Sequence, residues 1–314
     1  MVEQQKRRDK RVDLEVAIGS LSMHNPIMVA SGTFGYGEEF ADLTDIKELG
    51  AVISKSVTVE PWQGNKPPRV CETTAGMLNA IGLQNDGIDD FLKHKLPVLR
   101  EHSSRVVLSI AGKTPEEYRI LAEKVASSDI DALEINISCP NVQHRNSSRL
   151  FAQDPVDTEK IVACVKEKVA KPIIVKLSPN VTDISEIAKA AEAGGASAVS
   201  LINTVLGMAV DVNTKEPMLG NIKGGLSGPA IKPIALRMVW EAYNAVNIPI
   251  IGIGGIMNAY DALEFIICGA SAVQVGTANF VYPNIAVEII EGIKAYLKHH
   301  NIADIKSLVG SIKI

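Results

Sequence analysis

Short apolar runs alternate with helix-like segments along nearly the whole chain, and this alternation limits the possible folds more than any other feature. Runs rich in Val and Ile with few polar interruptions are typical of parallel strands that are buried on both faces. Eight units of strand and helix favour an α/β fold of the closed (β/α)8 TIM barrel type over an open doubly wound sheet. The expected strands cover residues 26–30, 51–57, 106–110, 132–138, 172–177, 198–203, 249–252 and 272–276.

Several of the segments between these strands carry helix signals. Residues 114–117 read Thr-Pro-Glu-Glu, which supplies an N-cap, a proline at N1 and a glutamate at N3. Asn258 is expected to cap a later helix. A further helix-like segment at about residues 38–49 is expected to end at Gly50 in a left-handed cap.

Three segments break the rhythm. Residues 12–23 alternate, turn at Gly19-Ser20 and alternate again, which predicts a small hairpin that plugs one end of the barrel. Insertions at 59–84 and 206–227 follow the second and sixth strands, and the later one contains a hairpin-like stretch at 208–215. Although 314 residues is long for one domain, barrels of about 250 residues are single units. We therefore expect one domain over residues 1–314.

Composition excludes several classes of function. The net charge is −4, and the only basic run lies at residues 6–11, so nucleic acid is not an expected partner. No apolar run approaches the ~18 residues of a membrane span. The four cysteines are widely spaced without a CxxC pair, so neither a metal site nor a disulfide framework is indicated. A reducing cytoplasm is the expected location.

Polar side chains gather where the expected strands end, which is where barrels of this type carry their chemistry. Lys55 and Lys176 fall in otherwise apolar runs, and burying an ammonium group without a partner is costly. One such lysine could simply extend its charged end to solvent, but two together point to an anionic or electron-rich ligand. The other polar residues at strand ends are Ser31, Ser56, Ser109, Asn136, Cys139, Ser178, Asn203 and Thr204.

Cys139 is the candidate reactive group. It follows a strand whose alternation runs through Ile135 and Ile137, and Pro140 prevents that strand from continuing. A thiol in this position could act as a nucleophile or as a general base. No histidine or aspartate occupies an obvious partner position, which weakens a protease-like interpretation.

Glycines follow the last two strands, where barrels commonly bind phosphate through backbone N–H groups. The dinucleotide fingerprint GxGxxG is absent, since residues 252–257 read G-I-G-G-I-M. These positions favour a barrel phosphate site over a nicotinamide-binding fold. The candidate residues are Gly228, Gly254, Gly255, Gly276 and Thr277.

Residues 136–142, Asn-Ile-Ser-Cys-Pro-Asn-Val, resemble the base-bearing motif of the dihydroorotate dehydrogenases that use cysteine. The resemblance covers about residues 12–297, and the closest subtype is the catalytic subunit of the NAD-linked form (class 1B). Further matching motifs lie at 30–33, 55–58, 79–85, 203–204, 225–233 and 276–280.

The resemblance implies one flavin mononucleotide (FMN) on the barrel. Its phosphate would rest on Gly228, Gly254-Gly255 and Gly276-Thr277, and Lys176 would face the N1/O2 side of the ring, where negative charge develops on reduction. Position 109 departs from the family, because it is Ser where asparagine is usual next to the flavin. The remaining residues implied to line the ring and ribityl chain are Ser31, Lys55, Ser56, Asn136 and Ile202.

The resemblance also implies a place for dihydroorotate against the flavin ring. Cys139 would take the proton from C5 while hydride leaves C6 for flavin N5, with Lys55 and Lys176 as the other catalytic residues. The loop at 143–151 lacks the glycines that the family pattern leads us to expect there, and such loops cover the substrate. The substrate would be held by Lys55, Asn79, Ala80, Ile81, Gly82, Leu83, Asn136, Asn203 and Thr204.

A homodimer of this chain, joined by an electron-transfer subunit into a heterotetramer, is the assembly that the resemblance implies. That partner would carry FAD and a [2Fe–2S] cluster, because this chain has neither a Rossmann fingerprint nor a cysteine cluster.

Other functions stay open from the sequence. The fumarate-linked dihydroorotate dehydrogenases also use cysteine, and a dihydropyrimidine dehydrogenase-like flavoenzyme uses a similar cysteine at a strand end. Quinone-linked relatives use a serine base, so Cys139 argues against them. From other classes, the alternatives are a Schiff-base lyase or aldolase with a lysine nucleophile, and a non-catalytic barrel that binds a phosphate ligand.

Overall fold

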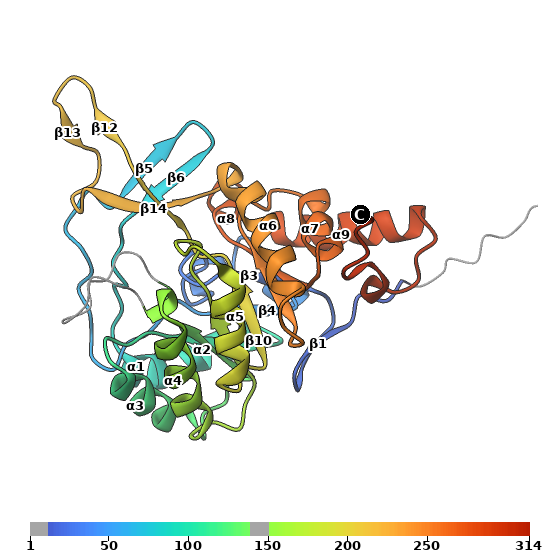
Figure 1. Cartoon of the computed structure of the whole chain (residues 1–314), viewed down its shortest axis with the longest axis horizontal. Coiled ribbons are helices and arrows are strands. Elements are labelled where there is room, and N and C mark those ends of the chain that lie inside the picture. Colours follow the sequence, from blue (N-terminus) through green and yellow to red (C-terminus); the bar gives the residue numbers. More distant parts are fainter. Residues whose placement is uncertain (1–11, 139–150) are drawn as a thin grey trace, which may run out of the picture.

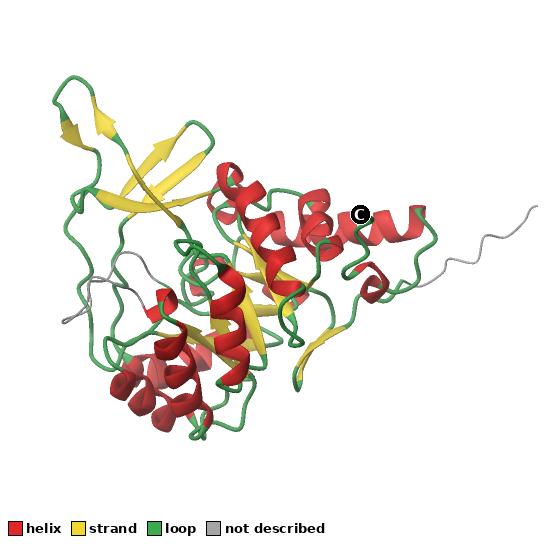
Figure 2. Cartoon of the chain, viewed as in Figure 1, coloured by secondary structure: helices red, strands yellow, loops and turns green. Residues whose placement is uncertain are grey.

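Eight parallel strands close into a barrel in the computed structural model, which describes residues 12–138 and 151–314. The closed order is β10-β15-β16-β3-β4-β7-β8-β9, so the predicted (β/α)8 barrel is confirmed. Helices lie outside the strands (Figure 2). The barrel strands are β3 (Ile27–Val29), β4 (Ala51–Ile53), β7 (Val106–Ile110), β8 (Ala132–Asn136), β9 (Ile173–Lys176), β10 (Ala198–Leu201), β15 (Ile250–Ile253) and β16 (Ala270–Val275).

The helices begin where the sequence signals place them. The Thr114 side chain accepts a hydrogen bond from the backbone of Glu117 at the start of α3, and Asn258 accepts one from Asp261 at the start of α7. The helices are α1 (Ile88–Asp90), the π-helix η3 (Phe91–Lys95), α2 (Leu96–His102), α3 (Pro115–Val125), α4 (Pro155–Lys166), α5 (Ile184–Ala193), α6 (Lys232–Tyr243), α7 (Ala259–Ile267), α8 (Ala278–Val281) and α9 (Ile285–His299), with short 3-10 turns η4 (Phe151–Gln153), η5 (Pro229–Ile231) and η6 (Ile305–Leu308).

The helix predicted at about residues 38–49 is wrong. Two separate 3-10 turns, η1 (Glu38–Phe40) and η2 (Ile46–Glu48), occupy this segment, and Asp45 caps the second by accepting from the backbone of Lys47. The left-handed cap at Gly50 is also wrong, because Gly50 is not among the residues with positive φ. A side chain there would instead overlap the carbonyl oxygen of Asn25, so Gly50 is needed for a close approach between backbones.

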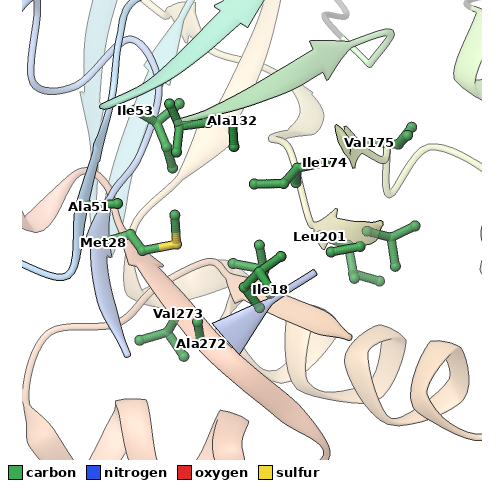
Figure 3. Close-up of a cluster of buried hydrophobic side chains, with 14 of the residues drawn as sticks. Ile18, Met28, Ala51, Ile53, Ala132, Ile174, Val175, Leu201, Ala272 and Val273 are labelled. Carbon is green, nitrogen blue, oxygen red and sulfur yellow. The ribbon is translucent and has the colours of Figure 1, made fainter. Parts of the chain in front are cut away.

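The predicted N-terminal hairpin closes one end of the barrel. Strands β1 (Val16–Ile18) and β2 (Leu21–Met23) pair antiparallel. At the turn, a Cβ on Gly19 would lie 3.3 Å from Cβ of Ser197 and 3.7 Å from Cβ of Pro172, which precede β10 and β9. Ile18 belongs to the same buried apolar cluster as Met28 and Ile174 (Figure 3). The hairpin therefore plugs the end at which the strands begin.

The two predicted insertions combine into one structure, which we call the arm sheet. Strands β5 (Val70–Thr73) and β6 (Gly76–Asn79) from the first insertion join β11 (Val205–Met208) and β14 (Lys223–Ser227) from the second in the order β11-β14-β6-β5. The expected hairpin at 208–215 is displaced along the chain, since β12 (Val210–Asp211) pairs with β13 (Glu216–Pro217). The arm sheet projects from the barrel with this hairpin at its tip (Figure 1).

No helix among the described residues is long and apolar enough to cross a membrane.

Candidate active site

A cavity of about 360 Å³ opens where the barrel strands end, and the arm sheet contributes one of its walls. Most of the residues predicted from the sequence to bind a ligand meet here, although they come from strands far apart in the chain. Those that line the cavity are Ser31, Lys55, Ser56, Asn79, Ile81, Gly82, Leu83, Asn136, Lys176, Ile202, Asn203, Thr204, Gly228, Gly254, Gly255, Gly276 and Thr277.

Three predicted site residues are not in this lining. Ser109 is fully buried and lies behind Ser56, with 2.8 Å between their hydroxyl oxygens. Ala80 is fully buried, and its backbone N–H donates to the carbonyl of Arg69 (2.7 Å). Cys139 lies outside the described residues.

Lys55 brings a positive charge to the cavity. It follows β4, and its backbone N–H donates to the carbonyl of Gly35 (2.9 Å). Within the described ranges its ammonium group has no ion-pair partner. Burial lowers the pKa of Lys55 from its ordinary value of 10.5; Glu39 works against this effect and Arg69 adds to it. A half-buried ammonium group of this kind is suited to an anionic ligand.

Lys176 is the last residue of β9, and only 5% of it is exposed. Its Nζ lies 3.9 Å from Oε1 of Glu134, which is fully buried on the neighbouring strand β8. This distance is an ion pair rather than a hydrogen bond. Lys176 therefore lines the cavity with a counter-charge behind it.

Glu134 is the centre of a buried polar layer inside the barrel. Its Oε1 accepts from the hydroxyl of Ser109 (3.2 Å), and its Oε2 accepts from Ser200 (3.3 Å) and from Nε2 of Gln274 (3.1 Å). These donors come from β7, β10 and β16. A buried carboxylate is tolerated only with such partners, because its transfer from water is costly.

A second chain of hydrogen bonds crosses the cavity floor. The side-chain NH2 of Asn136 donates to Ser56 (2.9 Å), and its Oδ1 accepts from the backbone (3.3 Å) and the hydroxyl (3.2 Å) of Ser138. Asn203 in turn donates to the hydroxyl of Ser138 (2.9 Å). Tyr118 donates to the backbone carbonyl of Asn136 (2.9 Å). The two asparagines, Asn136 at the end of β8 and Asn203 after β10, are thus held in fixed orientations by Ser138, the residue that precedes Cys139 in the sequence.

Three glycines of the lining form a cradle in which an added side chain would clash with its neighbours. Gly228, Gly254 and Gly255 have φ values of 94°, 131° and 70°, a region that favours glycine. A Cβ on Gly255 would lie 2.8 Å from the carbonyl oxygen of Gly228, and one on Gly254 would lie 2.9 Å from Cβ of Ala235. Backbone left uncovered in this way suits the close approach of a phosphate.

Side chains close the cradle on the side of the arm sheet. The hydroxyl of Thr277 donates to that of Ser227 (2.8 Å), which joins the start of α8 to β14. The cavity thus combines a cradle of uncovered backbone, two lysines and an amide-rich floor. Among the described residues, no group of three or more His, Cys, Asp or Glu side chains could hold a metal ion.

Sequence reasoning missed Glu134 and its partners Ser200 and Gln274. A signal was present, because the alternation of apolar residues through Ile135 and Ile137 leaves Glu134 on the same face of the strand as Asn136. The contribution of Met77 and Ser227 to the cavity wall had no such signal, since it depends on the pairing of two insertions distant in sequence.

Comparison with known proteins gives one consistent result. A sequence model described as "Dihydroorotate dehydrogenase" matches residues 13–297. The chain is 50% identical over 302 residues to the "Dihydroorotate dehydrogenase B (NAD(+)), catalytic subunit" of Alkaliphilus metalliredigens, covering 96% of this chain and 99% of that protein. Proteins of the same description from Thermoanaerobacter sp. (strain X514) and Geotalea uraniireducens are 52% and 53% identical, over 96% of this chain and 100% and 98% of theirs.

Proposed function

Because the chain belongs to the dihydroorotate dehydrogenase family, we propose that it is the catalytic subunit of an NAD-linked enzyme that oxidises dihydroorotate to orotate in pyrimidine biosynthesis. The observation that carries this proposal is the cavity itself, in which a glycine cradle, the half-buried Lys55 and the buried Lys176 meet at the strand ends. The family resemblance inferred from the sequence motifs is confirmed by the same comparisons.

FMN is the cofactor that these residues fit. The cradle of Gly228, Gly254 and Gly255 would hold its phosphate, because side chains at these positions would clash with neighbouring backbone and side chains. Ser31, Ser56 and Ile202 would line the ring and ribityl chain, and Gly276 with Thr277 would complete the phosphate site. When bound, FMN would supply the acceptor for the hydride that leaves C6 of the substrate.

Lys176 would stabilise the negative charge that develops on the cofactor side of the cavity. Its ammonium group is nearly buried, and electrostatic interactions are stronger where water is excluded. Asn136 would orient both ligands, since its side chain is fixed by Ser56 and Ser138.

Dihydroorotate carries a carboxylate, for which Lys55 is the matching cation. Cys139 would act as the general base for the C5 proton; it follows Ser138 directly in the sequence. The other residues proposed to hold the substrate are Asn79, Ala80, Ile81, Gly82, Leu83, Asn203 and Thr204. Ala80 would act only through the backbone of its segment, because its side chain is buried away from the cavity.

Electrons must then leave this chain for NAD. The relatives are named as catalytic subunits, which implies a partner. We propose that this partner carries FAD and a [2Fe–2S] cluster and that a homodimer of this chain joins it in a heterotetramer in the cytoplasm. Family membership favours this oxidoreductase over the Schiff-base lyase or aldolase and over the non-catalytic barrel.

The test is anaerobic reduction of the purified chain. It should be yellow with FMN bound and should bleach on addition of dihydroorotate. The reduced protein is then challenged with NAD, fumarate and quinone, with and without the partner subunit. We expect NAD to reoxidise it only when the partner is present. A colourless chain that cannot be reconstituted with FMN would contradict the proposal, and rapid reoxidation by fumarate alone would favour the fumarate-linked form.

A further inference from the structure

Glu134 is a fully buried carboxylate that does not line the cavity, yet it contacts Lys176, which does, and Ser109, which lies behind the lining residue Ser56. One contact is the ion pair with Lys176, at 3.9 Å. The other is the hydrogen bond from Ser109, at 3.2 Å. Both contacts are made by the same oxygen, Oε1, while Oε2 is held by Ser200 and Gln274. The proposed reaction gives this carboxylate no direct part.

Each serine hydroxyl has a single proton to donate, and this fixes the direction of the hydrogen bonds that lead from Glu134 to the cavity. An ionised carboxylate only accepts, so Ser109 must donate its single hydroxyl proton to Glu134. Ser109 therefore accepts in its 2.8 Å contact with Ser56, and Ser56 is the donor there. Ser56 must then accept from both Asn136 (2.9 Å) and Ser31 (3.1 Å).

Ser31 is the last member of this series of hydrogen-bonded hydroxyl groups, and it lines the cavity. Because its proton is directed at Ser56, Ser31 presents only lone pairs to a ligand. A ligand group at Ser31 would therefore be a hydrogen-bond donor, such as a hydroxyl or an N–H. The direction of three successive hydroxyl groups thus depends on one carboxylate.

The charge of Glu134 acts on the same cavity through Lys176. On β8 the charged neighbour of Lys176 is Glu134, on β10 its register partner is the uncharged Ser200, and Lys55 lines the same cavity. At 3.9 Å the carboxylate offsets part of the positive potential that Lys176 presents to a ligand. A ligand that becomes more negative during the reaction would respond to this balance.

Given the proposed function, on which the following rests, we propose that Glu134 is a positioning residue that sets the charge balance and the hydrogen-bond direction of the cavity floor around FMN. It acts through Lys176 on one side and through Ser109, Ser56 and Ser31 on the other, without contacting the ligands.

The test compares Glu134→Gln, Glu134→Asp and Ser200→Ala in the full chain with FMN bound, and measures the midpoint potential of the flavin. Gln has nearly the same shape but no charge, so Lys176 is left uncompensated. We expect E134Q to bind reduced FMN about tenfold more tightly relative to oxidised FMN, which is a shift of about +30 mV for a two-electron couple. E134D retains the charge and should stay within about threefold of the wild type on the same scale.

Ser200→Ala is the matched control, because it removes a hydrogen bond to the same carboxylate but no charge. Its potential should equal that of the wild type. A potential in E134Q that is unchanged or more negative would overturn the proposal. Equal shifts in E134Q and S200A would also overturn it, since a merely structural role of Glu134 would move both.

E134Q leaves Lys176 buried without a counter-charge, and Ser109→Ala provides the test if E134Q does not fold. S109A keeps the ion pair but cuts the hydroxyl chain between Glu134 and Ser56. The dissociation constant of FMN, measured by titration of the apoprotein, should rise about tenfold, in line with the loss of one directed buried hydrogen bond. An unchanged constant would overturn the proposal. Failure of the proposed function would be distinct, because the wild-type chain itself would then bind no FMN.

Discussion

The two ends of the barrel are built on the same eight strands and have opposite chemistry. Where the strands begin, the interior is apolar and is closed by Ile18 of the N-terminal hairpin. Where they end, it contains the Glu134 layer and opens into the cavity. The change occurs within two residues on the inward face of a strand: on β9, Ile174 is followed by Lys176. The position of an inward-facing residue along its strand thus determines whether it contributes to the apolar interior or to the polar end of the barrel.

The energetic roles of the two ends differ accordingly. At the apolar end, burial of side chains such as Ile18 and Met28 stabilises the fold by about 1.5–3 kcal/mol each. At the polar end, burial disfavours the charged form of Lys55, which opposes folding of the unliganded protein. Substitutions at the polar end should therefore affect activity, and substitutions at the apolar end should affect stability.

The largest expected effect lies at the polar end, at Cys139. Cys139→Ser should keep FMN but slow its reduction by dihydroorotate by about 10²–10⁴-fold, because the general base is lost. Anaerobic stopped-flow measurement of flavin bleaching gives the rate. Cys164→Ser is the control, since Cys164 belongs to α4 and burial raises the pKa of its thiol. Reduction at the wild-type rate in C139S would remove this residue from the proposed reaction.

At the apolar end, Ile18→Ala should lower the free energy of unfolding by about 2–5 kcal/mol, because it leaves a cavity in the plug. The turnover of the molecules that remain folded should be unchanged. Urea unfolding measures the stability, and Ser22→Ala, at an exposed position of the same hairpin, serves as the control. A selective loss of turnover in I18A with normal stability would break the distinction between the two ends.

Lys55→Met tests the opposite combination. Removing a charge-assisted contact to the substrate should lower kcat/KM roughly tenfold to more than a hundredfold, which corresponds to a loss of about 1.5–3 kcal/mol of transition-state stabilisation. The unliganded chain should be no less stable than the wild type, because a half-buried charge that burial disfavours has been removed. Steady-state kinetics and urea unfolding measure the two quantities. Lys189→Met on the exposed face of α5 should change neither.

The smallest effect concerns pH. Burial lowers the pKa of Lys55 from 10.5, so affinity for the anionic substrate should be present below the lowered pKa and be lost as pH rises through it. The unliganded protein should respond in the opposite direction. Between the lowered pKa and 10.5 the unfolded chain binds more protons at Lys55, so this residue's contribution to stability rises with pH. Comparison of wild type with K55M isolates the contribution of Lys55 to the pH dependence of substrate affinity and of the free energy of unfolding. Identical pH dependences in the two proteins would contradict the assignment of these effects to Lys55.

The sequence was most informative where a signal is local. Alternation and N-caps at Thr114 and Asn258 predicted the barrel and its helix starts, because these depend on neighbouring residues. The segment at 38–49 was mispredicted, since helical composition there is interrupted by Asp45, whose side chain caps a new turn.

Non-local features could be predicted only where the fold class itself implies them. Lys55, Asn136 and Lys176 lie at strand ends and line one cavity as expected, because parallel strands end at the same edge of a barrel. The register that sets Asn79 opposite Gly225 joins segments nearly 150 residues apart, and no local pattern specifies it. The role of Glu134 was overlooked because it depends on partners from four other strands.

The arm sheet has a consequence for protein engineering. One wall of the cavity is carried by β6 and β14, which belong to insertions after different barrel strands and pair with each other in the arm sheet. The wall is therefore a two-part cassette: a designer who wishes to move this substrate pocket onto another (β/α)8 scaffold must graft both insertions together, at strand positions that allow the same register. Each half grafted alone would present an unpaired strand edge, which is a template for aggregation.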